Sequence, residues 1–176
     1  IASANVTNVA VACTTNAYTI GGTVAGLAAG NSVVLRNNGG NDLTVAANGA
    51  FTFTTAITDG NAYAVTVFTQ PTTPNQTCVG TNGSGTLAGA NVTNVTVTCT
   101  TTTYTVGGTV SGLATGNSVV LRNNGGNDLN VAANGAFTFT TPVADGAAYA
   151  VTVFTQPTTP SQTCIVTNGS GNIAGA

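Results

Sequence analysis

The chain has 176 residues, a formal net charge of −2 and no histidine, and only 3% of its residues are charged. Two basic residues are too few to bind nucleic acid or an anionic membrane, which require clustered Lys and Arg. No run of 18 apolar residues is present, so we expect no membrane insertion. Four cysteines without histidine indicate disulfides in an oxidising compartment, and we expect neither enzyme activity nor a cofactor.

Short strands separated by turn residues are predicted throughout. In the first half, alternating apolar and polar residues predict strands at residues 18–24, 31–37, 42–47, 51–55, 62–69, 76–81 and 90–99. Residues 70–74 (QPTTP) predict an extended connection, and residues 82–89 a glycine-rich loop. About seven strands at this spacing are typical of a β-sandwich, so the predicted fold class is all-β.

An internal repeat dominates the sequence. Offsetting the chain by 86 residues aligns residues 1–90 with residues 87–176, and 71 of these 90 positions are identical. A period of this length is too long for a solenoid coil and suits a small autonomous β-domain. Cys13 aligns with Cys99, and Cys78 aligns with Cys164.

Charged and aromatic side chains recur at the same places in both repeats. Arg36 and Asp42 flank one hairpin turn, and Arg122 and Asp128 flank its copy, which predicts a cross-strand ion pair at each turn. The aromatic residues alternate along the strands, which favours packing in the core or on a sheet face over a sugar-binding face. These aromatic residues are Tyr18, Tyr63, Phe68, Tyr104, Tyr149 and Phe154.

The sequence ANVTNVTVTC (residues 90–99) and its copy ANVTNVAVAC (residues 4–13) each predict one strand with Val and Cys side chains on one face. Their placement is unequal. The copy at residues 4–13 has no strand-rich segment before it, whereas the strand-rich segment that ends at residue 176 has no copy after it. The chain therefore carries one strand too many at its start and one too few at its end.

This placement allows two divisions of the chain. A unit that begins at residue 4 would contain the disulfides Cys13–Cys78 and Cys99–Cys164, and nothing would be missing from it. A unit that begins at Tyr18 would close with Cys78–Cys99 and leave Cys13 and Cys164 to find partners elsewhere. The residues alone leave both divisions open.

The run YTVGGTVSGL…VVLRNNGGNDL…NGAFTFTTPVADGAAYAVTVFTQPTTPSQTC (residues 104–164), together with ANVTNVTVTC, resembles the tandem Ig-like repeats of large bacterial surface and secreted proteins. The resemblance covers essentially the whole chain and implies a unit from the Tyr strand through the VTC strand. It favours two tandem Ig-like β-sandwich domains, at residues 18–100 and 104–176. A donor strand within residues 1–14 precedes them, and a donated strand completes the second domain.

On this division, Val6, Val9, Val11 and Cys13 form a donor strand for a neighbouring chain, the mode by which pilins complement one another. Head-to-tail contacts of this kind give open filaments. We therefore expect a structural subunit of an extracellular filament whose partners are copies of itself. The disulfide pairing that follows is Cys78–Cys99 within the chain and Cys13–Cys164 between neighbouring subunits.

Two other interpretations remain. The chain is a slice of one continuous repeat protein, in which strand and groove belong to the same polypeptide. Alternatively, it is a stalk or adhesin segment of a long bacterial surface protein that binds a glycan or a host surface through its loops. The near-identity of residues 33–41 and 119–127 favours repetition over tuned recognition.

Overall fold

The computed structural model describes residues 5–175, and that range consists of strands and loops without a helix. The all-β prediction is therefore confirmed. Residues 1–4 of the predicted donor segment and residue 176 of the predicted second domain lie outside the described range. Within it, no helix is long and apolar enough to cross a membrane.

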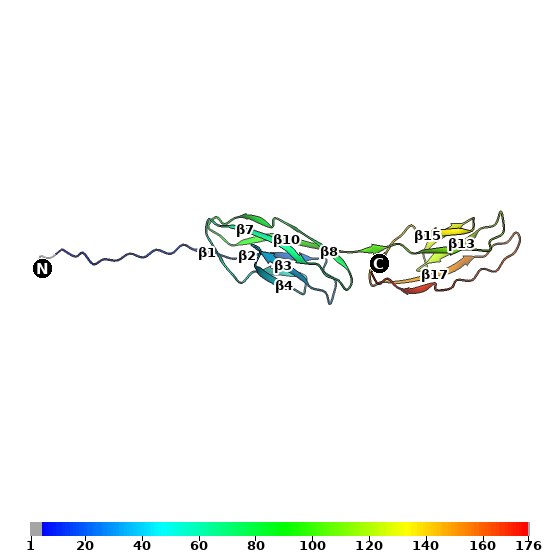
Figure 1. Ribbon diagram of the computed structural model, residues 1–176, viewed down its shortest axis with the longest axis horizontal. Helices are drawn as coiled ribbons and strands as arrows, with labels where there is room; N and C mark the ends of the chain where they lie inside the picture. The colour runs from blue at the N-terminus through cyan, green and yellow to red at the C-terminus, as the bar shows by residue number, and fades with distance from the viewer. Residues whose placement is uncertain (1–4, 176) are drawn as a thin grey trace.

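Two β-sandwich units follow one another along the chain, the first unit at residues 17–101 and the second unit at residues 103–175. Each has a hydrophobic core of its own. The units lie end to end, and residues 5–16 extend from the first unit on the side opposite the second (Figure 1). The molecule is therefore a short rod with an extended arm at one end.

The first unit is built from two four-stranded sheets, in the orders β5-β2-β10-β8 and β4-β3-β7-β9, and from the small pair β1-β6. Its strands are β1 Ala17–Tyr18, β2 Ile20–Ala25, β3 Val33–Asn37, β4 Asn41–Val45, β5 Gly49–Thr52, β6 Ile57–Thr58, β7 Ala62–Thr69, β8 Gln76–Thr81, β9 Ser84–Thr86 and β10 Val92–Thr101.

Strand β10 holds the first of these sheets together. It pairs in parallel with β2 on one side and antiparallel with β8 on the other. Its side chains Val95, Val97 and Cys99 are three of the 14 buried residues in the core of this unit. Because β8 joins the rest of this sheet only through β10, removal of β10 would both split the sheet and open the core.

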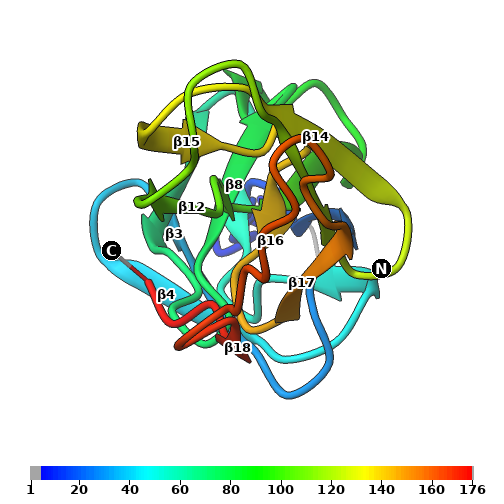
Figure 2. The same cartoon turned by 90° about the vertical axis from the view of Figure 1, so that its right-hand side faces the viewer.

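The second unit repeats this plan with one difference. Its strands are β11 Thr103–Tyr104, β12 Gly107–Val110, β13 Val119–Asn123, β14 Asn127–Val131, β15 Gly135–Thr138, β16 Val143–Ala144, β17 Ala148–Thr155 and β18 Ser170–Asn172. The sheet β14-β13-β17-β18 matches its counterpart, but β12 pairs with β15 in a sheet of two, and residues 162–167, which align with β8, form no strand. Figure 2 shows β12 and β15 on one side of this unit and β17 and β18 on another.

The difference between the units is visible in their cores. Among the described residues, the cluster of buried residues counts 14 in the first unit and five in the second. Phe51 and Cys78 are buried, whereas their counterparts Phe137 and Cys164 are half-buried. The second unit therefore keeps its strands but covers its core incompletely.

One sequence prediction about local structure is wrong, because the predicted loop at residues 82–89 contains β9, which pairs with β7. In the single chain, residues 5–13 of the predicted donor segment and residues 162–167, the copy of β8, have no strand conformation. Both of these segments lack a neighbour to supply the inter-strand hydrogen bonds that define a strand.

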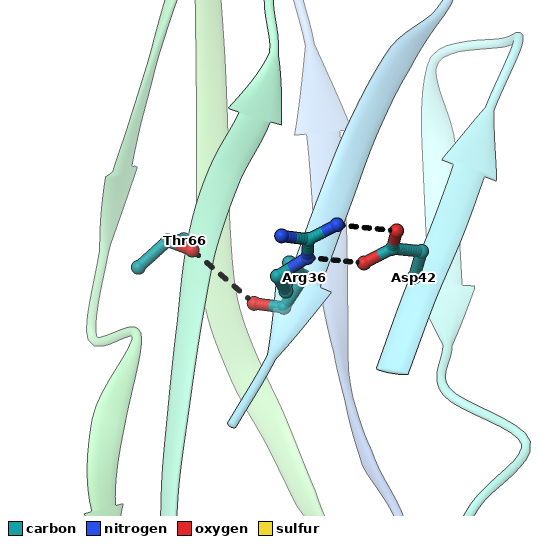
Figure 3. A network of polar contacts seen from close by, with 3 residues as sticks. All are labelled: Arg36, Asp42 and Thr66. Atoms are coloured by element: carbon teal, nitrogen blue, oxygen red, sulfur yellow. Dashed lines mark hydrogen bonds and ion pairs between the residues drawn. The ribbon is translucent and has the colours of Figure 1, made fainter. Parts of the chain in front are cut away.

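The hairpin ion pairs are confirmed. Arg36 lies directly opposite Asp42 in the register of β3 and β4, and donates two hydrogen bonds to its carboxylate (Figure 3). These bonds lower the pKa of Asp42. The guanidinium also stacks on Phe68, with Cζ 3.2 Å from the ring centroid, so Phe68 lies on the exterior with 53% of its surface exposed. Of the two positions expected for the aromatic residues, Phe68 and its copy Phe154 therefore have the one on a sheet face and not the one in the core.

Strand β10 and the arm, which have nearly the same sequence, allow a first test of this architecture. Val97 is 1% exposed and Val11 is 84% exposed. We expect Val97→Ala to lower the free energy of unfolding of the isolated chain by about 2 kcal/mol, because it removes buried methyl groups. Val11→Ala, the same change in the arm, leaves that free energy unchanged. Urea unfolding at low protein concentration measures both, and an equal loss in the two variants would contradict the burial of β10.

Candidate functional site

A groove of about 690 Å³ opens in the second unit between β12 and residues 162–169. Its apolar lining comes from both sheets of the unit and includes Val106, Val110, Val119, Leu121, Phe137 and Val151. Some of these side chains, including Phe137 and Val110, are only partly buried. The floor of the groove is therefore formed by side chains of the hydrophobic core.

Strand β10 occupies the corresponding place in the first unit. The two walls of the groove, β12 and residues 162–167, align with β2 and β8, which are the two strands that pair with β10. A strand inserted between these walls would find unpaired backbone groups on each side. The groove is thus bounded by the counterparts of the two strands that pair with β10 in the first unit.

A glycine marks the path of that strand. In the first unit, a Cβ atom added at Gly22 would lie 1.7 Å from the carbonyl oxygen of Val95, because the backbone of β10 lies directly beside β2 there, next to an irregularity in the ladder. Its counterpart Gly108 meets no backbone atom: the nearest atoms to an added Cβ belong to the ring of Phe137, at 3.1 Å. No backbone atom of the second unit therefore requires glycine at position 108. A strand that lay beside β12 as β10 lies beside β2 would require it.

The cysteines follow the same pattern. Cys78 of β8 lies directly opposite Cys99 of β10, and the two form a disulfide. Cys13 and Cys164 are free thiols, so the alternative pairs Cys13–Cys78 and Cys99–Cys164 are absent from the structure. Without the strand opposite it, Cys164 is half-buried at the edge of the groove.

Cys164 is nevertheless held in the position that Cys78 has in the first unit. The side chain of Gln156 accepts a hydrogen bond from the Cys164 N–H at 2.8 Å and donates one to its carbonyl at 3.0 Å. Gln70 makes the same two bonds to Cys78, at 2.7 and 3.0 Å. These two hydrogen bonds therefore hold the backbone of Cys164 in place although its thiol is free.

The predicted donor residues lie at the other end of the molecule (Figure 1). Val6, Val9 and Val11 are 75%, 78% and 84% exposed, although Val95 and Val97, the counterparts of Val9 and Val11, are buried and Val92, the counterpart of Val6, is half-buried. The structure does not bring these valines or Cys13 to the groove of the same chain. Gly108 and Gln156 were not predicted as site residues, because the only signal for them in the sequence is their recurrence in both repeats.

The junction between the two units is held by a carboxylate. Asp145 of the second unit accepts hydrogen bonds from the N–H of Asn75 in the first unit, at 2.6 Å, and from Gly175 in its own, at 2.7 Å. The Asn75 carbonyl in turn accepts from the N–H of Thr102 in the connecting segment, at 2.9 Å. Asp145 is 7% exposed, and these backbone donors lower its pKa, the bond from Asn75 most of all.

Comparison with protein-family models, with curated proteins and with solved structures finds no match to this chain. The function must therefore be argued from the groove, the arm and the junction.

The glycine contrast predicts opposite outcomes for two equivalent substitutions. Gly22→Ala would push a methyl group into the backbone of β10, and we expect the first unit to lose at least about 3 kcal/mol of folding stability. Gly108→Ala meets only the movable ring of Phe137 and should leave the stability of the isolated chain within about 1 kcal/mol. Thermal unfolding of the two variants measures this difference, and similar losses would show that Gly108 is required by its own unit.

The junction predicts a dependence on pH. Because the pKa of Asp145 is lowered in the folded chain, its carboxylate stabilises the junction above the ordinary aspartate pKa of 3.8. That contribution is lost as the pH falls below 3.8 and through the lower folded value. Small-angle X-ray scattering should show a less extended chain in this acidic range.

Asp145→Asn is the control for that experiment, because it removes the titrating group at the junction and leaves Asp42 and Asp128 in place. We expect this variant to show the looser junction at every pH. If the wild-type chain and the variant change alike on acidification, the junction does not depend on the Asp145 carboxylate.

Proposed function

We propose that this protein is a structural subunit of an extracellular filament, and that it polymerises head to tail by β-strand donation. The arm of one subunit fills the groove of the second unit of another and becomes the central strand of its sheet. The two units are on this proposal Ig-like domains, at residues 18–100 and 104–176. One observation carries the proposal: the groove lies where β10 lies in the first unit, and the arm repeats the sequence of β10.

The pairing of β10 gives the register of the proposed joint. Val92 lies opposite Ile20, Val95 opposite Gly22 and Val97 opposite Val24 in the parallel ladder. Subtracting 86 from the donor positions and adding 86 to the acceptor positions gives the equivalent pairs in the polymer. These pairs are Val6 with Val106, Val9 with Gly108, Val11 with Val110 and, on the antiparallel side, Cys13 with Cys164.

Burial of apolar surface drives this association. Each valine of the arm is at least 75% exposed in the free chain, and burying one such side chain contributes roughly 1.5–3 kcal/mol. The core-lining residues of the groove are covered at the same time, and both groove edges gain hydrogen bonds to the inserted strand. The groove and the arm therefore complete each other.

A disulfide then makes the joint covalent. The Cys13 thiol of one subunit and the Cys164 thiol of its neighbour lose two protons and two electrons to an external disulfide such as oxidised glutathione, which is reduced to two thiols. Such bonds persist in oxidising compartments, as the Cys78–Cys99 bond within the chain also requires. These requirements support an extracellular location.

The donation must pass between subunits. Once residues 5–13 lie in a groove, only residues 14–17 remain to reach the first unit, and four extended residues span at most about 14 Å. The first unit contains the ten-residue strand β10, which is roughly 33 Å long. This unit lies between the arm and the second unit (Figure 1), and the groove is lined by residues of the second unit. The arm therefore cannot fold back into its own groove.

Glycan binding, the alternative function, gains no support from the surface. Stacking on a sugar requires an open aromatic face. The exposed rings of Phe68 and Phe154 are instead stacked by Arg36 and Arg122, at 3.2 and 3.3 Å from Cζ to the ring centroid.

Gel electrophoresis of the oxidised protein tests the proposal directly. We expect a ladder without reductant that collapses to a single band at 17.1 kDa with reductant. Deletion of residues 1–13 should abolish both the ladder and the filaments seen by electron microscopy. A single 17.1 kDa band under both conditions would contradict the intersubunit disulfide. A far larger mass under both would show that the strand is supplied within one long polypeptide.

Gly108→Ala tests the path of the donated strand without touching the arm. The added methyl group would meet the carbonyl oxygen of Val9 in the donated strand, just as a methyl group at position 22 would meet that of Val95. Filaments should therefore not form. Gly126→Ala is the matched control, because an added Cβ has no neighbour within 4 Å there. Filaments of normal length from the Gly108 variant would contradict the proposed register.

A further inference from the structure

The residues that hold the two units together at the junction have counterparts in the repeat, and these counterparts lie at the two ends of the molecule. Asp145, Gly175 and Thr102 on the second-unit side align with Asp59, Gly89 and Asn16 at the arm end of the first unit. Asn75 on the first-unit side aligns with Ser161. Since Asn75 is at the end of the first unit that meets the second, Ser161 lies at the free end of the second unit.

Half of this arrangement is already formed at the arm end. The Asp59 carboxylate accepts a hydrogen bond from the Gly89 N–H at 2.8 Å, as Asp145 does from Gly175. The Asp59 N–H donates to the Asn16 carbonyl at 2.9 Å, as the Asp145 N–H donates to Thr102. In the described chain, no donor takes the place that Asn75 has at Asp145, and Asp59 is half-buried where Asp145 is buried.

We propose that Asp59 is a docking site for a second copy of this chain: the loop at residues 159–161 of the preceding subunit binds there, and its Ser161 N–H donates to the Asp59 carboxylate. The proposal rests on the strand donation proposed above, which delivers that loop to the arm end. In the same contact, the Ser161 carbonyl accepts from the Asn16 N–H, as the Asn75 carbonyl accepts from Thr102.

The sequence differences between the two junctions leave these contacts intact. Asn75 is replaced by Ser161, and Thr102 by Asn16, but both junction residues act through backbone N–H and C=O groups. The carboxylate is the one side chain that takes part in these bonds, and it is aspartate in both places. The connecting segments have equal length, because four residues separate Cys13 from Tyr18 and Cys99 from Tyr104.

If the junctions within and between subunits are equivalent, every unit in the filament contacts the next one in the same way. A joint between subunits would then be as well fixed as the joint within a subunit, and successive units would be related by one rotation and translation. Strand donation alone does not require this, since an inserted strand followed by a flexible connection would leave alternate joints free to bend.

Electron cryomicroscopy of oxidised filaments tests the docking site. In wild-type filaments, we expect the Ser161 nitrogen within hydrogen-bond distance of an Asp59 carboxylate oxygen, and equal angles at successive joints. Asp59→Asn keeps an oxygen for the Gly89 N–H but places an NH₂ group against the Ser161 N–H. This variant should polymerise with a wild-type ladder and show a broader angle distribution at every second joint. Asp145→Asn is the matched variant for the joints within subunits.

The outcomes separate the two proposals. Wild-type filaments in which Asp59 is remote from Ser161, or Asp59→Asn filaments as straight as wild type, would overturn the docking site and leave strand donation standing. Failure of the wild-type chain to form a disulfide ladder would overturn strand donation and the docking site with it. Should Asp59→Asn not fold, the distance in the wild-type filament decides alone.

Discussion

The close approach of β10 to its parallel neighbour β2 is the constraint on which the rest of the structure depends. One strand supplies the hydrogen-bond partners for two others, three side chains of the core and half of the disulfide. Its backbone approaches so closely that only glycine fits at position 22. In the order β5-β2-β10-β8, loss of β10 would leave β8 without a partner and expose one edge of β2, and the second unit shows this state, with β12 paired only to β15.

The comparison of the two repeats shows how strongly context governs local structure. The residues after Gln76 and those after Gln162 differ little in sequence, yet the former are a strand and the latter are not. The same holds for ANVTNVTVTC, which is a strand, and for the arm, which is not. In each pair, both segments have residues that favour a strand. Whether a segment forms a strand depends on whether a neighbouring backbone is available to pair with it.

The features that were predictable from the sequence are those fixed by local patterns. Alternation predicted the main strands, and the charges flanking a tight turn predicted the Arg36–Asp42 pair. Features that depend on distant segments were not predictable: the close approach of β10 at Gly22, the junction at Asp145 and the stacking of Arg36 on Phe68 each join elements whose proximity follows only from the fold. Phe68 also shows the limit of alternation, because the same periodicity describes a core face and a face covered by a long cation.

The parallel pairing of β2 with β10 has a mechanical consequence. The chain enters the first unit just before β2 and leaves it just after β10, so a pull on the two ends draws these neighbouring strands in opposite directions along their length. The hydrogen bonds between β2 and β10 then bear the force together and do not break one after another. The disulfide bridges only 21 positions of sequence, so a ruptured unit would retain a short loop that cannot extend. Such a unit is a strong, stiff link under tension.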